Sequence, residues 1–585
     1  MESETRNCQS CKKDFTIEPD DFGFYEKIKV PPPTFCSECR MIRRMNFRNA
    51  RALYKRKVEH AEADVFSSFR PDSPLTIYEQ SYWWSGDWNA MQQGRSYDFS
   101  HPFFTQLKDL MQKIPWPSGY NLRSVNSEYC NNVNDLKNCH LLFNSGFSES
   151  CAYGAEILRC NEVFDATKVV GCELSRELLD CEKCNRVFFS HDCVGCSEVY
   201  FSQNLVGCHD CFGCINLRHK QYHIFNKQHT KEEYKEFLSK LNLGSHKTVE
   251  EMQEKSSRHF LNFPHRYAHG QNNSNVSGDY LDHSKNTYWS YLCREMEDCK
   301  YCQLILFLPS RNSYDITVAG GELCYEVEEG GGYGVKFSWL ALPKNLKTRQ
   351  INLSDMEYSM ECFNSSYLFG CVGLKNKQYC ILNKQYTETE YAKLVPKIIK
   401  HMNDMPYVDA KGKVYRYGEF FPPELSPFCY NETIASEYFP KTKEEVLAQG
   451  YKWKEKEKRD YKIEIESEDL PDHIKDAPDS IVGRIIGCLH RGGCNEQCTE
   501  AFRIIESELV FLKRMNIALP WLCPNCRHFQ RLRKRNPLRL WHRRCMCEVE
   551  KHGHNSPCPN EFETSYSPDR PEMVYCEECY KREVY

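Results

Sequence analysis

The cysteines in the middle of the chain recur at fixed intervals. They lie on two ladders with a spacing of 21 residues, formed by Cys130, Cys151, Cys172, Cys193 and Cys214 and by Cys139, Cys160 and Cys181. All twelve cysteines from Cys130 to Cys214 also fall on one residue class modulo three. A fixed period with small residues in register is typical of a solenoid, in which equivalent positions stack inside successive coils. The ladders therefore predict a mainly β protein built on a parallel β-helix-like solenoid, with about 21 residues per coil.

The triplet spacing within these ladders carries a second expectation. One inward residue in every three implies coils that turn through several short faces, made of short β-strands or, as the alternative, of polyproline-II-like segments. Cysteine suits the inward positions because a protonated thiol is small, apolar and readily buried. We therefore expect these thiols to be buried and inert rather than to bind metal or carry redox chemistry.

An internal repeat predicts a second solenoid half. Residues 213–234 match residues 370–391 without a gap, with identical pairs such as Asn226 and Asn383. In each copy a threonine, Thr230 or Thr387, precedes a glutamate by three residues, as in a helix capping box. We predict two solenoid halves, each followed by a helix. The second half is less regular, and residues 313–342 are expected to form ordinary longer strands with a glycine turn.

Two C-x-x-C pairs near the N-terminus predict a zinc module. Cys8, Cys11, Cys36 and Cys39 supply four thiolates, the ligand set of a structural tetrahedral zinc site. A helix that starts at the second pair gives a treble-clef, or zinc-ribbon, arrangement. A short domain of this kind needs such a metal to hold its small core together.

The same module returns near the C-terminus. At an offset of 487 residues, the cysteines of the N-terminal module map onto Cys498, Cys523 and Cys526, and Arg40 maps onto Arg527. Cys8 maps onto Asn495, so the fourth ligand is either Cys494 or, over an expanded loop, Cys488. Cys494 is preferred because it lies nearer the expected spacing.

A third, shorter module ends the chain. Its clear ligands are Cys558, Cys576 and Cys579, and the fourth comes from Cys545, Cys547 or the pair His552 and His554. We favour Cys547. Together the modules predict three structural zinc ions as the only cofactors.

These patterns divide the chain into eight segments. Residues 1–57 form the first zinc module, 58–120 an aromatic region that caps the first solenoid end, 121–228 the first solenoid half and 229–275 a helical connector. The second solenoid half spans 276–385. A helix, a proline and aromatic stretch and a charged linker span 386–478, the second zinc module 479–544, and the third 545–585.

Charge is distributed unevenly along the chain. The net charge is −4, but residues 40–57 and 527–544 each carry eight Lys or Arg and no acid, so the remainder carries −20 (−4 minus 16). Basic zinc-module helices of this kind predict sequence-tolerant binding to nucleic acid, RNA in particular. The candidate phosphate-binding residues are Arg40, Arg43, Arg44, Arg48, Arg51, Arg527, Arg531, Arg533, Lys534, Arg535, Arg543 and Arg544.

Two other interpretations stand beside nucleic-acid binding. The basic helices can dock against the acidic body of the protein or stay solvated, and the solenoid surface can instead bind a protein partner. An enzyme is not expected, because Cys193, Cys208 and Cys211 lie on the inward ladder although His191 and His209 stand nearby. No small-molecule substrate is evident. The chain has neither a long apolar run nor a signal-peptide core, so we expect a cytoplasmic protein without a membrane segment.

Two longer motifs carry a resemblance to a known group of proteins. They are FYEKIKVPPPTFCSECRMIRRMNFRN in the first module and CPNCRHFQRLRKRNPLRLWHRRCMC, which runs from the second module into the third. The chain resembles a family of uncharacterised bacterial zinc-ribbon proteins, predicted in reduced-genome bacteria known mainly from metagenomes. The resemblance implies zinc binding and a cytoplasmic location, but it brings no established activity. Some members are labelled as CoA-transferase-like, and this sequence holds no catalytic pattern that supports that label.

Overall fold

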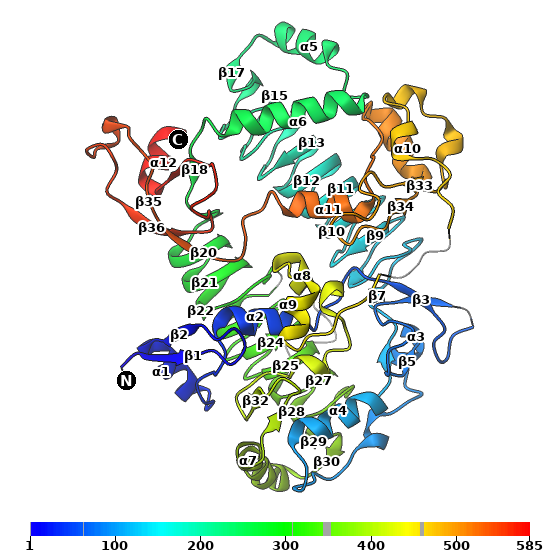
Figure 1. Ribbon diagram of the computed structural model, residues 1–585, viewed down its shortest axis with the longest axis vertical. Helices are drawn as coiled ribbons and strands as arrows, with labels where there is room; N and C mark the ends of the chain where they lie inside the picture. The colour runs from blue at the N-terminus through cyan, green and yellow to red at the C-terminus, as the bar shows by residue number, and fades with distance from the viewer. Residues whose placement is uncertain (1, 63, 307, 343–352, 457–460) are drawn as a thin grey trace.

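The computed structural model describes residues 2–62, 64–306, 308–342, 353–456 and 461–585. Two β-solenoids form the body of the molecule, the first in the upper half of the view and the second in the lower half (Figure 1). The predicted fold class is thus confirmed. Residues 307 and 343–352 of the predicted second half, and residues 457–460 of the predicted charged linker, lie outside the described residues.

The first solenoid is a ladder of mostly parallel strands. Two short strands, β7 (Asn121–Leu122) and β8 (Val133–Asn134), precede its nine-stranded sheet. The strands of that sheet are β9 (His140–Phe143), β10 (Ala152–Leu158), β11 (Asn161–Val170), β12 (Glu173–Glu182), β13 (Asn185–His191), β14 (Ser197–Tyr200), β15 (His209–Phe212), β16 (Gln221–Ile224) and β17 (Lys227–Gln228).

Neighbouring strands of the first solenoid pair at a constant offset. Asn161 of β11 pairs with Glu173 of β12, and Glu173 pairs with Asn185 of β13. One coil therefore contains twelve residues, and the expectation of about 21 was wrong. Both 12 and 21 are multiples of three, so cysteines spaced by 21 residues all point inward. They do not stack directly above one another, because each step of 21 residues ends on a different face of the coil.

A left-handed residue marks every corner of the first solenoid. From Arg123 to Phe225, every third residue has a φ between 46° and 63°. Each coil therefore has four corners and four short faces, with one inward residue on each face. This confirms the predicted triplet geometry. Asn and Asp recur at the corners because they adopt left-handed backbone more readily than other non-glycine residues.

Small inward side chains bond the backbone of the following coil. The N–H of Cys184 donates to Cys172 Sγ over 3.2 Å, and the N–H of Ile157 donates to Ser145 Oγ over 3.0 Å. The Cys172 thiol in turn donates to the carbonyl of Val170. A thiol or hydroxyl serves as both donor and acceptor, so it satisfies an interior amide that would otherwise be buried unpaired.

The second solenoid is less regular, as predicted. Its strands are β19 (Gly270–Gln271), β20 (Ser274–Asp282), β21 (Lys285–Arg294), β22 (Met296–Lys300), β23 (Ser310–Thr317), β24 (Tyr325–Glu328), β25 (Lys336–Leu342), β26 (Ser354–Glu357), β27 (Met360–Phe363), β28 (Ser366–Phe369), β29 (Gln378–Ile381) and β30 (Lys384–Gln385).

The coils between β23 and β25 are one residue shorter than those of the first solenoid. Tyr314 pairs with Tyr325, and Tyr325 pairs with Lys336, so each coil here has eleven residues. The expectation of ordinary longer strands was wrong, because this segment continues the solenoid. Glycine permits the tight stacking: a Cβ on Gly331 would lie 1.8 Å from the carbonyl oxygen of Gly320.

The repeated segments found in the sequence close both solenoids. Asn226 accepts a hydrogen bond from the N–H of Ile215 and donates one to its carbonyl, over 2.8 and 2.9 Å. Asn383 bonds Val372 in the same way. Each side-chain amide thus makes the two backbone hydrogen bonds that a residue of a further coil would make. The antiparallel pairs β16–β17 and β29–β30 then cover the last strand edge, which would otherwise be open to pairing with another chain.

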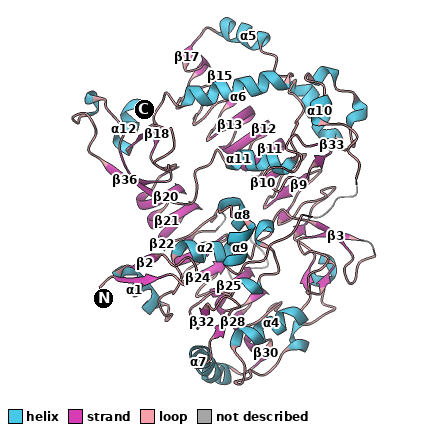
Figure 2. Cartoon of the chain, in the orientation of Figure 1, coloured by secondary structure: helices cyan, strands magenta, loops and turns pink. Residues whose placement is uncertain are grey.

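Helices surround the solenoids, as the colouring by secondary structure shows (Figure 2). The capping boxes predicted at Thr230 and Thr387 are present at the starts of α5 and α7. The helices are α1 (Pro19–Lys27), α2 (Ser37–Met45), α3 (Gln80–Trp84), α4 (Phe103–Lys113), α5 (Lys231–Lys240), α6 (His246–Phe260), α7 (Glu388–Asp404), α8 (Ile434–Tyr438), α9 (Lys443–Ala448), α10 (Glu506–Met515), α11 (Pro524–Leu532) and α12 (Glu577–Val584).

The aromatic region before the first solenoid contacts both halves. The ring of Phe103 on α4 lies 5.4 Å from that of Phe369 in the second solenoid. The ring of Phe66 lies 4.4 Å from that of Tyr129, where the first solenoid begins. Helix α4 of this region therefore covers the second solenoid. Gln80 of the same region accepts a hydrogen bond from the N–H of Asn121 and donates one to its carbonyl, both over 2.8 Å, so the region also covers the first solenoid end, for which a cap was predicted.

Short antiparallel pairs complete the fold. Three of these pairs build the cysteine-rich modules: β1 (Glu4–Asn7) with β2 (Asp14–Ile17), β33 (Ile486–Gly487) with β34 (Ala501–Phe502), and β35 (Trp541–Arg544) with β36 (Glu561–Thr564). Within the described ranges, no helix is both long and apolar enough to cross a membrane.

Candidate metal centres and docked basic helices

The four N-terminal cysteines form one compact group. Cys8 and Cys11 follow β1 in the turn to β2, and Cys36 is the N-cap residue of α2. The four sulfur atoms lie within 4.8 Å of one another, and Cys11 Sγ is 3.8 Å from Cys36 Sγ. Tetrahedral coordination with metal–sulfur bonds of about 2.3 Å separates its sulfur atoms by about 3.8 Å. The group predicted from Cys8, Cys11, Cys36 and Cys39 can therefore hold a metal ion.

In the second module, Cys488 joins Cys498, Cys523 and Cys526. The N–H of Cys523 donates to Cys488 Sγ over 3.2 Å, as the N–H of Cys36 donates to Cys8 Sγ over 3.3 Å. Cys488 is thus the structural equivalent of Cys8, and the preference for Cys494 in this group was wrong. The loop between the first two ligands holds nine residues here and two in the first module, so counting along the sequence misplaced the ligand.

In the third module, Cys545 joins Cys558, Cys576 and Cys579. The N–H of Cys576 donates to Cys545 Sγ over 3.2 Å, which repeats the contact of the other two modules. The preferred Cys547 is not part of this four-cysteine group. It lies in a neighbouring group with His552, His554 and the shared Cys579.

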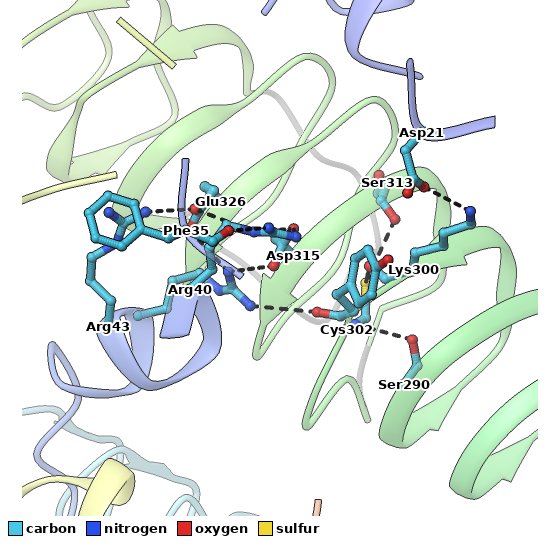
Figure 3. Close-up of polar contacts among 12 residues, drawn as sticks. Asp21, Phe35, Arg40, Arg43, Ser290, Lys300, Cys302, Ser313, Asp315 and Glu326 are labelled. Carbon is cyan, nitrogen blue, oxygen red and sulfur yellow. Dashed lines mark hydrogen bonds and ion pairs between the residues drawn. The ribbon is translucent and has the colours of Figure 1, made fainter. Parts of the chain in front are cut away.

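Helix α2 lies on the second solenoid with its arginines facing inward (Figure 3). Arg40 and Arg44 both approach Asp315, with nitrogen–oxygen distances of 2.8 Å. Arg44 and Arg43 also reach Glu326, at 3.0 and 2.8 Å. Desolvation opposes the charge of Arg43, but nearby carboxylates, Glu326 first among them, outweigh it and raise the pKa of this guanidinium. The arginines are therefore held as buried cations.

Helix α11 docks on the first solenoid in the same way. Arg531 Nη1 lies 3.2 Å from Glu177 Oε1, and Arg535 Nη2 lies 3.0 Å from Asp180 Oδ1. Arg527 pairs with Asp165, which also binds Arg176 of the solenoid itself over 2.9 Å. The two cysteine-rich modules related by the internal repeat therefore also dock in the same way.

The acidic partners that the two solenoids supply share one backbone feature. Each stands at a left-handed corner, with a φ between 50° and 56°. A corner residue points its side chain away from the packed interior, so a row of acidic corners makes a groove for a basic helix. The six residues are Asp165, Glu177, Asp180, Asp315, Glu326 and Glu329.

The docked helices do not present an exposed basic face. Seven of the twelve predicted phosphate-binding side chains are at most 5% exposed. Arg51 is 9% exposed at its side chain, whereas Arg533 and Arg544 are 60% and 82% exposed. Lys534 is also exposed, and Arg543 is half-buried. The seven buried residues are Arg40, Arg43, Arg44, Arg48, Arg527, Arg531 and Arg535.

This burial corrects the expectation of a basic surface on α2 and α11. The physical reason is the −20 carried by the rest of the chain, which places carboxylates where the helices dock. Docking against the acidic body was the alternative that the charge pattern left open.

The inward cysteines of the first solenoid are buried, as predicted, except for Cys130, which is half-buried. Cys193, Cys208 and Cys211 are at most 1% exposed, and the Cys193 thiol donates to the backbone carbonyl of His191, not to its ring. Burial raises the pKa of Cys160, which belongs to the same inward residue class, to about 11, so this thiol is protonated at neutral pH. Neither His191 nor His209 is placed to activate a thiol.

A cleft of about 580 Å³ lies between α6, the first solenoid and the second zinc module. Phe201 and Phe260 form apolar parts of its wall, and His246 stacks on Trp521 with their ring centroids 4.0 Å apart. Charged and polar side chains, Arg176 and Ser257 among them, line other parts. Sequence reasoning missed this cleft because three segments far apart in the chain build it, and no local motif marks any of them.

No protein-family model matches the chain. A search of curated proteins also returns no match.

Proposed function

We propose that this protein is a non-catalytic scaffold that offers its solenoid surfaces to a protein partner, while three zinc ions hold its modules together. The observation that carries the proposal is the burial of α2 and α11 against the solenoids. Arginines that neutralise Asp315 and Asp165 are not available to neutralise phosphates. The zinc modules then act as internal clamps, and the surfaces left for recognition belong to the solenoids.

Zinc is the metal that suits these groups. Each four-cysteine group supplies four sulfur ligands at tetrahedral spacing, such as the 3.6 Å between Cys579 Sγ and Cys558 Sγ. Thiolate sites with four protein ligands have no open position for water or substrate, and such closed sites are structural. This supports a role in folding and not in hydrolysis.

The cleft beside α6 is the surface that we propose for a partner. Its volume lies in the range of about 300–1,000 Å³ that is typical of small-molecule pockets, and is therefore large enough to receive a side chain of a partner. Its apolar and charged lining residues fit a protein segment that inserts an apolar side chain and pairs its polar groups with the charged side chains.

A blocking variant tests the cleft. Ser257 is exposed on α6 and lines the cleft, so Ser257→Trp should fill it. Ser239, exposed on α5 and outside the cleft lining, is the matched control, since each serine donates to a carbonyl of its own helix. A partner cross-linked to the metal-loaded protein in lysate of its source organism is purified and titrated. Ser257→Trp should weaken binding at least tenfold, and Ser239→Trp should leave it unchanged.

Either of two results would contradict the proposal. Equal binding by both variants would remove the cleft from recognition. Binding of the metal-loaded protein to generic single-stranded RNA or duplex DNA, with a salt slope that reports several neutralised phosphates at about −0.7 to −0.9 per phosphate, would restore nucleic acid as the partner.

A further inference from the structure

We propose that the third zinc module holds two metal ions that share the thiolate of Cys579. Two groups of four ligands meet at this residue. One consists of Cys545, Cys558, Cys576 and Cys579, and the other of Cys547, His552, His554 and Cys579. In each group the ligand atoms all lie within 4.8 Å of one another. Seven residues thus give each of two metals four ligands, with one sulfur bound to both.

Short contacts tie the second group together. Cys547 Sγ lies 3.1 Å from His552 Nδ1, and His554 Nε2 lies 3.2 Å from Cys579 Sγ. On its other side, Cys579 Sγ lies 3.6 Å from Cys558 Sγ of the first group. A thiolate sulfur has lone pairs for two metals, and Cys579 is the residue placed between the two sets.

Both histidines are oriented for metal binding through one ring nitrogen. The outer nitrogen of His552, Nε2, lies 3.3 Å from the carboxylate of Glu583. The outer nitrogen of His554, Nδ1, lies 2.9 Å from the backbone carbonyl of Asn555. Metal-binding histidines commonly make such contacts, which fix the tautomer and aim the other nitrogen at the metal.

Charge balance favours a second ion. Cys545, Cys547 and Cys579 are each at most 4% exposed, and thiolates in such surroundings need a nearby cation. One divalent ion with four thiolates leaves a charge of −2. Two divalent ions with five thiolates and two neutral imidazoles leave −1, so the second ion reduces the buried charge.

The extra ligands come from an insertion between the first two ligands of the module. Twelve residues separate Cys545 from Cys558, where two separate Cys8 from Cys11. The expanded loop of the second module brings His490, Cys494 and Glu496 near Cys526. There Glu496 is also held by Arg533, so we restrict the proposal to the third module.

The experiment counts metal in the full-length protein. The double variant His552→Ala/His554→Ala should bind one zinc ion fewer than wild type by elemental analysis. The control variant His209→Ala/His219→Ala, which removes two exposed histidines of the first solenoid, should lose none. An unchanged metal count in a folded His552→Ala/His554→Ala variant would overturn the proposal.

A second measurement needs no variant. In wild-type protein loaded with ¹¹³Cd, two cadmium signals should show scalar coupling to each other through the shared sulfur of Cys579. Fully loaded protein without a coupled pair would also overturn the proposal. The inference extends the zinc assignment made above but does not depend on the scaffold role, since loss of the second ion leaves the four-cysteine groups and the cleft beside α6 in place.

Discussion

At the scale of single residues, the first solenoid depends on small inward side chains that can both donate and accept hydrogen bonds. Cys172 shows the arrangement, because it accepts from the N–H of Cys184 and donates to the carbonyl of Val170. Serine does the same at Ser145 and Ser202, where the N–H groups of Ile157 and Cys214 are the donors. Cysteine therefore recurs in the interior as a structural residue, and its chemistry is secondary.

Substitutions at Cys172 test this role. Cys172→Ser keeps both hydrogen bonds and should leave the free energy of unfolding nearly unchanged. Cys172→Ala leaves the amide of Cys184 unpaired in the interior and should cost about 1–3 kcal/mol. Urea unfolding of the metal-loaded protein followed by circular dichroism measures both. Equal stability of the serine and alanine variants would show that the interior amides need no side-chain partner.

The same residues explain what the sequence could and could not predict. The triplet class of the cysteines identified the inward positions. The number of triplets per coil depends on the geometry of the corners, and the only sign of that geometry in the sequence is the enrichment of Asn, Asp and Gly at the corner positions. The capping residues Asn226 and Asn383 appeared as a repeat without a stated role. Cys488 and Cys545 were open alternatives because loop length does not reveal which cysteine ends a strand, and the docking of α2 required carboxylates that lie about 275 residues away along the chain.

At the scale of elements, each basic helix and its acidic groove form a buried ion-pair network. Arg44 is fully buried and joins Asp315 of β23 to Glu326 of β24. Buried networks of this kind lose much more when one partner is removed than an exposed pair does, because the remaining charges stay in a poorly solvated site.

Removal of one arginine should therefore destabilise the docked helix strongly. Arg44→Ala and its equivalent Arg531→Ala should each lower the free energy of unfolding by about 3–5 kcal/mol, with little dependence on salt. The exposed Arg544, which pairs with Glu561, is the control, and Arg544→Ala should change stability by less than about 0.5 kcal/mol. Chemical denaturation measures all three. Similar small losses at Arg44 and Arg544 would contradict the buried network.

One contact between elements, made by a histidine, should make the free energy of unfolding depend on pH. His269 Nδ1 lies 3.0 Å from Asp279, which also contacts Ser565 of the third module. Burial lowers the pKa of His269, but the attraction of Asp279 outweighs it and raises this pKa to about 9.

Because the folded-state pKa of His269 lies above its ordinary value, this stabilisation is complete below about pH 6.5 and is lost as the pH rises through about 9. The loss should be about 3 kcal/mol. His269→Gln should flatten the decline in stability across this interval, measured by urea unfolding at several pH values. An equally steep decline in the variant would assign the pH dependence to another group.

At the scale of the whole molecule, each of the two docked modules packs on the solenoid that lies farther from it in the sequence. The N-terminal module docks on the second solenoid, and the second module, near the C-terminus, docks on the first. Arg48 joins the two halves directly, because it pairs with Glu329 of the second solenoid at 2.7 Å and donates to Asn144 of the first at 2.7 Å. The cysteine-rich modules thereby join segments from opposite ends of the chain, which is what the proposed scaffold with fixed surfaces requires.

Amide hydrogen exchange on the full-length, metal-loaded protein tests this account most directly. We expect the backbone amides of α2 and α11 to be protected as strongly as those of the neighbouring strands β23 and β11. Removal of metal with a chelator should release protection in both helices and at the acidic corners beneath them. Fast exchange of α2 and α11 in the metal-loaded protein, with the solenoid strands still protected, would mean that the basic helices are free in solution and would contradict their role as internal clamps.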